Sequence, residues 1–361
     1  MISKASAEIE HILEYYPIGH LDYYKQDERG YCNTNFAIKT EQQGHRKKYF
    51  FRRYKSEIKE EELRFEHSLI EHLVKCNFDL VPTLIKTRDG NSYVRQIDEA
   101  DPGRPVFYAI FEFLDGEDRY TWVNPHCGAG EIVNAASVLA GFHKTVYGFT
   151  PEGRKYQPKI SDLLPEVSST ANRILDKRGG TVFDECLANN LELIERNVTQ
   201  TRNELSSFGY QGLLQLVNHG DFHPGNLKFE DDQVVALLDF DWSKIEARCF
   251  DVALAIYYFF TDWEASRDGQ FRSEQAALFL NAYQDSLIDG PDLGPLDDRE
   301  LKCLPSMLVA SNLYVLNWTL SDFLNQRVDP EEYLVYLEHA VNLVKWLEIP
   351  DNRRALESIS T

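Results

Sequence analysis

Residues 217–251 contain the densest group of polar side chains in the chain, set between apolar runs. Asp221 and Asn226 lie on either side of a Pro-Gly pair, which forces the backbone through an irregular turn. The two short apolar runs that follow predict a β-hairpin with its turn at residues 230–233, and folding this hairpin brings Asp239 beside Asp221 and Asn226. Two carboxylates and a carboxamide form a site of hard oxygen ligands. Mg²⁺ prefers such ligands, with phosphate oxygens and water completing its shell.

The order of these residues is similar to that in a known group of enzymes. Residues 219–226, HGDFHPGN, match the H-x-D-x-x-x-x-N catalytic loop of kinase-like phosphotransferases, and residues 238–241, LDFD, resemble their metal-binding loop. The chain most resembles the group of aminoglycoside phosphotransferases, choline kinases and type II homoserine kinases. The resemblance implies ATP and Mg²⁺ as cofactors, with Asp221 as catalytic base, Asn226 and Asp239 as metal ligands, and His219 and Asp251 as structural supports of the loops.

The same resemblance implies an α+β, bilobal protein-kinase-like fold. Its N-terminal lobe would hold an antiparallel sheet plus a helix, and its C-terminal lobe would be mostly helical. We place the nucleotide-binding lobe, which ends in the hinge, at residues 1–114 and the C-terminal lobe at residues 115–361. With 361 residues, 43% of them hydrophobic, the chain can bury a large core, and its length favours two lobes.

Apolar periodicity in the first lobe predicts both helices and strands. Helices are expected at residues 7–16 and 56–75. Strands are expected at residues 21–24, 35–40, 48–54, 79–87, 92–97 and 106–114, of which the first three form an antiparallel meander.

Several residues of this lobe fall where the kinase-like fold binds nucleotide. Residues 30–35 occupy the place of the phosphate-covering loop but carry one glycine rather than G-x-G-x-x-G. Asn33 and backbone N–H groups could meet phosphate there, and an ordinary hairpin turn is an equal alternative. Arg52 aligns with the basic residue of the third strand, with Arg53 as the runner-up and a plain surface arginine as the simpler interpretation. Glu66, in the following helix, is in register to form the ion pair with Arg52.

In this family the last strand of the first lobe runs into the hinge. Backbone groups near Glu112 to Leu114 would bind the adenine edge of ATP there. A plain apolar strand has the same pattern, so the resemblance implies the region and no single contact.

From about residue 121 the composition becomes helical. Helices are expected at residues 131–147, 163–177, 183–208, 252–263, 273–287, 298–324 and 331–347. His143, in the first of these, is expected to be a packed structural histidine. The family builds its acceptor pocket from the C-terminal helices, although most of their aromatic residues should be core. The polar candidates for contact with the acceptor are Asp262, Asn312, Asn317 and Asp322.

Composition excludes other classes of protein. A formal charge of −20 argues against a nucleic-acid partner, which needs a basic face. No apolar run approaches the roughly 18 to 20 residues that cross a bilayer, and the opening residues lack the apolar centre of a signal peptide. The six cysteines form no C-x-x-C pair, which argues against a zinc site or a short disulfide framework. We therefore expect a cytoplasmic protein with reduced thiols and no membrane partner.

The expected reaction is ATP- and magnesium-dependent phosphoryl transfer to a hydroxyl group of a small, amino-bearing molecule such as homoserine, choline or an aminoglycoside. Carboxylates such as Asp262 and Asp322 could receive its ammonium group. The acidic composition gives only weak support for a cationic substrate, because solubility explains it more simply. The alternatives are a Ser/Thr protein kinase of the same fold and a degenerate kinase fold that serves as a binding module. A metallohydrolase with His219 and His223 as metal ligands is disfavoured, because Gly220 and the Pro-Gly pair oppose the helix that such spacing needs.

Overall fold

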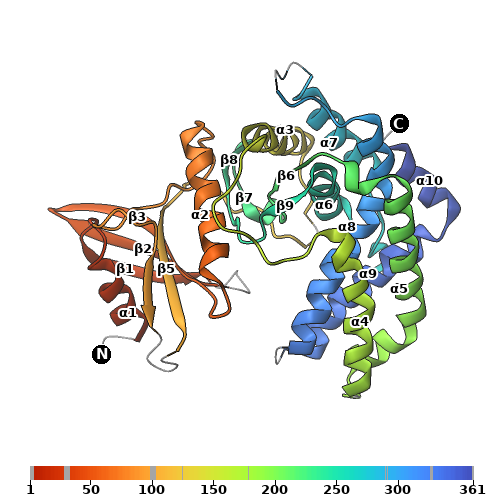
Figure 1. Cartoon of the computed structure of the whole chain (residues 1–361), viewed down its shortest axis with the longest axis horizontal. Coiled ribbons are helices and arrows are strands. Elements are labelled where there is room, and N and C mark those ends of the chain that lie inside the picture. Colours follow the sequence, from red (N-terminus) through yellow and green to blue (C-terminus); the bar gives the residue numbers. More distant parts are fainter. Residues whose placement is uncertain are drawn as a thin grey trace. The chain divides into compact units, whose positions relative to one another are not determined.

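The structure is a computed structural model that describes residues 4–27, 33–97, 103–123, 125–177, 179–288, 290, 292–325 and 328–359. Backbone contacts divide the chain into two compact units, whose elements Figure 1 labels. The first unit comprises Met1–Gly116, Thr150–Lys155 and Ala236–Leu238. The second unit comprises Glu117–Phe149, Tyr156–Val235 and Asp239–Thr361. The fold is α+β, as predicted, with its large sheet in the first unit and most of its helices in the second.

The first unit is built on an antiparallel sheet with the strand order β1-β2-β3-β5-β4. Its strands are β1 (His20–Asp27), β2 (Thr34–Gln42), β3 (His45–Arg53), β4 (Val94–Ile97) and β5 (Pro105–Glu112), and its helices are α1 (Lys4–Leu13) and α2 (Glu60–Lys75). The three-stranded meander is confirmed, because β2 pairs residue by residue with both of its neighbours.

The helices α1 and α2 lie on opposite faces of this sheet (Figure 1). Successive residues of a strand point to opposite faces. Arg53 of β3 pairs with Glu8 of α1 at 3.4 Å, whereas its neighbour Arg52 pairs with Glu66 of α2 at 3.3 Å. On the α1 side the helix buries Ile9 and Ile12 in an apolar cluster with strand residues such as Phe51. Arg52 and Arg53 therefore reach opposite faces of the sheet.

The strand predicted at residues 79–87 is not formed. Leu84 makes a single bridge with Phe111, and the Ile85 N–H donates to the Ile110 carbonyl at 2.8 Å. Pro82 lacks an N–H group and so cannot continue a ladder of hydrogen bonds. Since β3 occupies one edge of β5, this bridge and β4 share the other edge. The α2 helix also begins four residues later than predicted, at Glu60.

The second unit is mostly helical. Its helices are α3 (Ala129–Val146), α4 (Ile160–Lys177), α5 (Val182–Ser207), α6 (Arg248–Phe260), α7 (Ser273–Asp285), α8 (Asp298–Asn325), α9 (Pro330–Leu347) and α10 (Pro350–Ser358). There are also two small sheets, one of β6 (Gln215–Asn218) with β9 (Lys244–Ala247) and one of β7 (Leu227–Glu230) with β8 (Gln233–Leu237), whose last two residues are assigned to the first unit. The β7–β8 hairpin and the helices predicted in this region are confirmed, whereas β9 and α10 had not been predicted.

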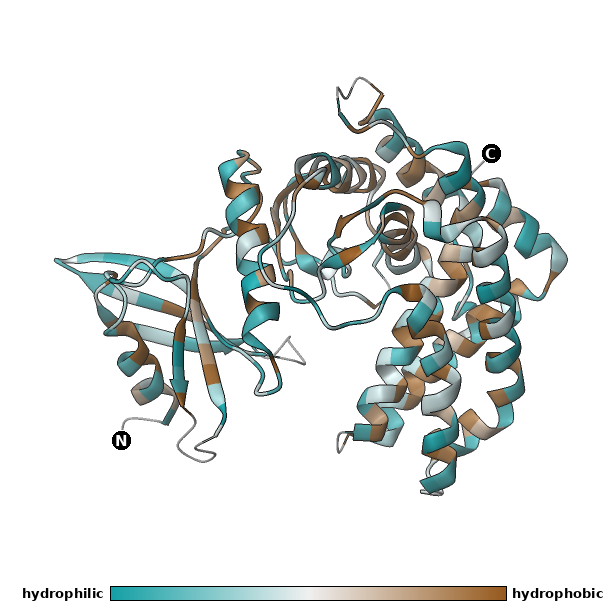
Figure 2. Ribbon diagram, viewed as in Figure 1, coloured by the Kyte–Doolittle hydropathy of each residue, from teal (hydrophilic) through white to brown (hydrophobic). Residues whose placement is uncertain are grey.

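Helix α6 is the core of the second unit. All thirteen of its residues are buried, and it packs against α7 and α8. Figure 2 colours it brown along much of its length. A helix that is apolar on all sides is typical of a buried core position, so polar residues on α6 have specific partners inside the unit. None of the helices in the described part of the chain combines the length and apolar character needed to cross a membrane.

Candidate active site

The predicted catalytic loop begins where β6 ends, and a glycine fixes its first turn. Gly220 has φ +77°, a conformation that L side chains rarely adopt. A Cβ atom at this position would lie 2.3 Å from the carbonyl oxygen of Trp242. The Ser243 hydroxyl donates to the His219 carbonyl at 3.1 Å. The segment that follows β8 therefore lies against the catalytic loop.

Asp251, in the first turn of α6, holds this loop by its backbone. Its carboxylate accepts hydrogen bonds from the His219 N–H at 2.7 Å and from the Gly220 N–H at 2.9 Å. His143 of α3 lies 3.0 Å from the same carboxylate, and both side chains are fully buried. Since a carboxylate only accepts, His143 Nε2 carries the proton, and Nδ1 accepts from the Tyr283 hydroxyl at 2.7 Å. His143 is thus a packed structural histidine, as predicted.

Electrostatics keep this buried pair as a carboxylate and a neutral imidazole. Burial raises the pKa of Asp251, but the hydrogen bond from His143, electrostatic interactions with His143 and His219, and the hydrogen bond from the Gly220 N–H lower it by more, so the net pKa is lowered. Burial lowers the pKa of His143 more than Asp251 raises it. Asp251 therefore stays ionised and His143 stays neutral near pH 7.

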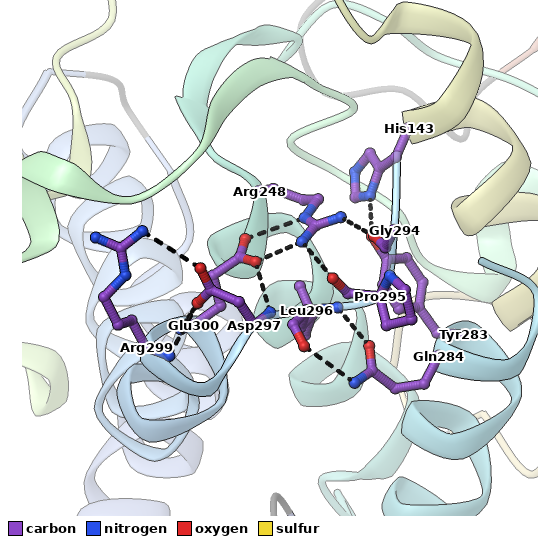
Figure 3. A network of polar contacts seen from close by, with 10 residues as sticks. All are labelled: His143, Arg248, Tyr283, Gln284, Gly294, Pro295, Leu296, Asp297, Arg299 and Glu300. Carbon is purple, nitrogen blue, oxygen red and sulfur yellow. Dashed lines mark hydrogen bonds and ion pairs between the residues drawn. The ribbon is translucent and has the colours of Figure 1, made fainter. Parts of the chain in front are cut away.

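The N-terminus of α6, which carries Asp251, is fixed by the network in Figure 3. Arg248 donates to Glu300 Oε1 at 3.0 Å and to the backbone carbonyls of Gly294 at 2.7 Å and Pro295 at 3.1 Å. Its guanidinium also pairs with the second oxygen of Glu300. A planar guanidinium that donates in several directions is a rigid anchor. Arg248 thus holds the helix turn from which Asp251 reaches the loop.

Asp221 and Asn226 are in direct contact, as predicted. Asn226 Nδ2 donates to the Asp221 carbonyl at 2.9 Å and to Asp221 Oδ2 at 3.0 Å. Burial raises the pKa of Asp221, but His223, His219 and the Tyr258 hydroxyl lower it by more, so the net pKa lies below its ordinary value. Asp221 is therefore ionised at neutral pH, which a base must be. The effect of Tyr258 on the pKa of Asp221 was not predicted, because the sequence identifies Tyr258 only as an aromatic residue within a helix.

The second acidic loop begins at Asp239, which has φ +64°. The next residue, Phe240, is buried, and its ring lies 4.9 Å from the His219 ring and 6.2 Å from the Phe142 ring. This packing fixes the loop beside the catalytic loop. Positive φ in a residue other than glycine is uncommon and concentrates at functional sites. The conformation of Asp239 is therefore a second sign, besides the sequence motif, that this loop carries function.

The oxygen ligands at this site fit a divalent cation whose remaining coordination positions are filled by phosphate oxygens and water. The Nδ2 atom of Asn226 is held by Asp221, which turns the Oδ1 atom of the same amide away from that carboxylate. Asn226 Oδ1 and the Asp239 carboxylate are hard oxygen ligands of the kind Mg²⁺ takes sparingly from proteins. Among the described residues no group of three or more His, Cys, Asp or Glu could hold a metal.

The nucleotide-binding candidates lie in the first unit, where Arg52 is buried. Arg52 Nε donates to Asn35 Oδ1 at 3.1 Å, and Nη1 donates to Glu66 Oε1 at 3.3 Å. Its guanidinium lies within 6 Å of three aromatic rings, those of Phe50, Tyr54 and Phe111. The predicted Arg52–Glu66 pair is present. Asn35, the cross-strand partner of Arg52, was missed, although the register of the meander could have identified it.

The other predicted nucleotide contacts have structural partners. Asn33 Oδ1 accepts from the Lys55 N–H at 2.9 Å, and residues 30–32 of the predicted phosphate loop lie outside the described residues. Glu112 accepts from Lys47 Nζ at 2.8 Å, and its own N–H donates to the Thr83 carbonyl. Leu114 follows the end of β5 and is partly buried.

Of the polar residues predicted to contact the acceptor, Asp262 already has its charge balanced by two arginines. It is buried and lies 3.1 Å from Arg272 and 3.4 Å from Arg267. A carboxylate held by two guanidinium groups is a poor receiver of a ligand ammonium group. Asp322 accepts from the Tyr333 hydroxyl at 3.1 Å.

The two asparagine candidates lie on α8. Asn312 is buried, and its Nδ2 donates to the Ala340 carbonyl at 3.0 Å. Asn317 is partly exposed, while its Oδ1 atom is buried and has no hydrogen-bond partner in the described part of the chain. Asn312 Oδ1 is likewise buried and without a hydrogen-bond partner among the described residues, so each of the two asparagines has a polar atom that a partner could still satisfy.

These loops and this fold define a kinase-like phosphotransferase, and comparison with known proteins identifies the family. A family model described as the phosphotransferase enzyme family matches residues 24–289, and the chain belongs to that family. The homoserine kinase of Parvibaculum lavamentivorans is 27% identical over 91% of this chain and 92% of its own length. The homoserine kinase of Zymomonas mobilis is 26% identical over 79% of this chain and 78% of its own length.

Solved structures agree on the fold. A microcompartment-associated aminopropanol kinase superposes with a TM-score of 0.71 at 16% identity, over 97% of this chain and 99% of that one. The choline kinase of Cryptosporidium parvum superposes with a TM-score of 0.59 at 16% identity, over 98% of both chains. The predicted kinase-like fold is thereby confirmed.

Proposed function

We propose that the protein transfers the γ-phosphoryl group of ATP to a hydroxyl group of a small, amino-bearing molecule. The observation that carries this proposal is Asp221, an ionised carboxylate held by Asn226 in a loop that Asp251 fixes through two backbone hydrogen bonds. In the reaction, the acceptor oxygen forms a bond to the γ-phosphorus while the bond from that phosphorus to ADP breaks. The proton of the acceptor hydroxyl passes to Asp221.

The other predicted residues have matching roles in this proposal. Arg52, braced by Glu66 and Asn35, binds the ATP phosphates, and Asn33 and the backbone at Glu112 to Leu114 contact the nucleotide. Asn226 and Asp239 would hold Mg²⁺, which neutralises charge on the phosphates when bound. His219 and Asp251 keep the catalytic loop in place. All of these assignments rest on the motif and on the contacts described above.

For the acceptor, homoserine is the first compound to test. Relatives that cover about nine tenths of this chain are homoserine kinases, and two structural neighbours are kinases of aminopropanol and choline. These three acceptors share a hydroxyl group and an amino or ammonium group on a short carbon chain. Because Asp262 is neutralised by arginines, it is not the ammonium receiver in this proposal. The predicted cytoplasmic location remains a prediction.

An acceptor screen tests the proposal. Purified protein with ATP and Mg²⁺ would be incubated with homoserine, aminopropanol, choline, an aminoglycoside and a generic protein substrate, and phosphorylated products would be identified by mass spectrometry. We expect a phosphate ester of one small amino alcohol or amino acid, formed only when Mg²⁺ is present. Phosphate on the protein substrate with every small compound inert would favour the protein-kinase alternative. A calorimetric titration without magnesium-dependent ATP binding would favour the binding-module alternative.

A further inference from the structure

His223 lies in the catalytic loop, two residues after Asp221, and the roles proposed above do not include it. Its Nε2 atom is 3.4 Å from Asp221 Oδ2, and its side chain is only 10% exposed. Its Nδ1 atom is buried and has no hydrogen-bond partner within the described ranges of the chain. Through Nε2 the ring meets the carboxylate of the proposed base.

Three neighbours hold the imidazole ring in this place. A Cβ atom on Gly225 would lie 3.0 Å from both the Cε1 and the Nδ1 atoms of His223, so a side chain there would crowd the ring. The Tyr258 ring meets it edge-on at 5.2 Å. The His223 carbonyl accepts from the Asn226 N–H at 2.9 Å. The Pro-Gly pair of the motif thus turns the chain and leaves room for the histidine.

Two side chains approach the same oxygen of the base, Asn226 through a hydrogen bond and His223 at ion-pair distance. Asn226 Nδ2 lies 3.0 Å from Asp221 Oδ2, and His223 Nε2 approaches that atom as well. A carboxylate only accepts hydrogen bonds, so a hydrogen on Nε2 is what makes this 3.4 Å contact attractive. Donors on Oδ2 fix the rotation of the carboxylate about its Cβ–Cγ bond. That rotation sets the direction in which Oδ1 points.

We propose that His223 is a positioning residue for phosphoryl transfer. Its Nε2–H group holds the Asp221 carboxylate in the orientation in which Oδ1 receives the proton of the acceptor hydroxyl. The inference rests on the proposed function, since it assigns a partner to the base of that reaction. Tyr258, whose ring meets the imidazole edge-on at 5.2 Å, also interacts with Asp221 and lowers the pKa of that carboxylate.

The test compares three variants in steady-state kinetics with the acceptor found in the screen. His223→Leu fills similar volume without a donor, and we expect kcat to fall about 100-fold, the loss that accompanies a misplaced reacting group, while the KM for ATP stays within about twofold. His223→Gln keeps an Nε2–H donor at a similar reach, and we expect it to restore most of kcat. His126→Leu is the matched control, because His126 is half exposed and pairs with the surface residue Glu264. It should behave like the unaltered protein.

Several results would overturn the inference. One is a His223→Leu variant with unaltered kcat, and another is a glutamine variant as impaired as the leucine variant although both melt at the unaltered temperature. A readout that needs no activity is nitrogen-15 NMR of the imidazole in the full-length protein. Finding the ring proton on Nδ1 rather than Nε2 would refute the inference even if the leucine variant failed to fold. An unaltered protein that phosphorylates no acceptor would instead refute the proposed function.

Discussion

Among single residues, Arg52 and Arg53 show how strand geometry decides between neighbours that the sequence leaves open. Both lie on β3 and carry the same charge. Arg52 faces α2 and is held by Asn35 and Glu66, whereas Arg53 faces α1 and pairs with Glu8 at 3.4 Å. The alternation of side chains along the strand therefore assigns Arg52, and not Arg53, to the ion pair with α2.

Lysine substitutions at these two positions test that assignment. Arg52→Lys keeps the charge but loses the planar fork that bonds Asn35 and Glu66 at once, so we expect kcat/KM for ATP to fall about 10- to 100-fold. Arg53→Lys is the matched control and should leave kcat/KM within about twofold. Steady-state kinetics at varied ATP concentration provide the measurement. A larger loss in the Arg53 variant would reverse the assignment.

Among the elements, the catalytic loop depends on how tightly β6, the segment after β8 and the first turn of α6 approach one another. Gly220 is where this approach is closest, because a Cβ there would overlap the Trp242 carbonyl. Gly148, just after α3, has the same φ of +77°, but a Cβ atom added there would meet no atom within 4 Å. The two glycines thus separate backbone strain from steric overlap.

Alanine substitutions use this difference. Gly148→Ala should lower the free energy of unfolding by about 1 kcal/mol, the cost of a left-handed backbone with a side chain. Gly220→Ala should lower it by about 2–4 kcal/mol, because the overlap adds to the same strain, and should also lower kcat by moving the loop. Urea denaturation and kinetics measure both effects. Equal losses of unfolding free energy in the two variants would mean that the loop moves to relieve the overlap at Gly220, and would contradict this prediction.

The sequence predicted the elements that carry strong local signals. The Pro-Gly turn, the β7–β8 hairpin and the long amphipathic helices follow from spacing and turn chemistry alone. The false strand at residues 79–87 has suitable apolar residues, but Pro82 and the shared edge of β5 leave it only a bridge. The short strand β9 has little pattern of its own and exists because β6 offers it a partner.

Contacts within the site were predictable only where the motif implied them. Asp221 and Asn226 meet within one loop, and their contact follows from the motif. The neutralisation of Asp262 by Arg272 and Arg267 depends on side chains whose directions the sequence does not determine. The approach of Tyr258 to Asp221 likewise depends on how α6 packs in the second unit. Acceptor choice depends on long-range contacts of this kind. The identity of the acceptor is therefore the part of the site that the sequence predicts least well.

On the scale of the whole molecule, the fold buries histidines that would otherwise take up protons in mildly acidic solution. His143 and His339 are both buried, and burial lowers the pKa of each, partly opposed by Asp251 for His143 and by Asp268 for His339. Their folded-state pKa values thus lie below the ordinary value of about 6.5 that the unfolded chain retains. The unfolded state binds more protons in this range, so stability must fall as the pH falls.

The protein should therefore be less stable at pH 5.5 than at pH 7.5. For each pH unit below the pKa in the unfolded state, each histidine lowers the free energy of unfolding by up to about 1.4 kcal/mol, until the pKa in the folded state is reached. His339→Gln should remove one share of this dependence. Urea midpoints across this pH range provide the measurement. A midpoint that rises on acidification would contradict the burial argument.

The central claim, that Asp221 is the base of a phosphotransferase, is tested most directly by Asp221→Asn. The amide keeps the size of the side chain but cannot take a proton. We expect kcat to fall by about 10²- to 10⁴-fold, while the calorimetric Kd for ATP with Mg²⁺ stays close to that of the unaltered protein. Turnover within about tenfold of the unaltered protein, with the same phosphorylated product, would contradict the account.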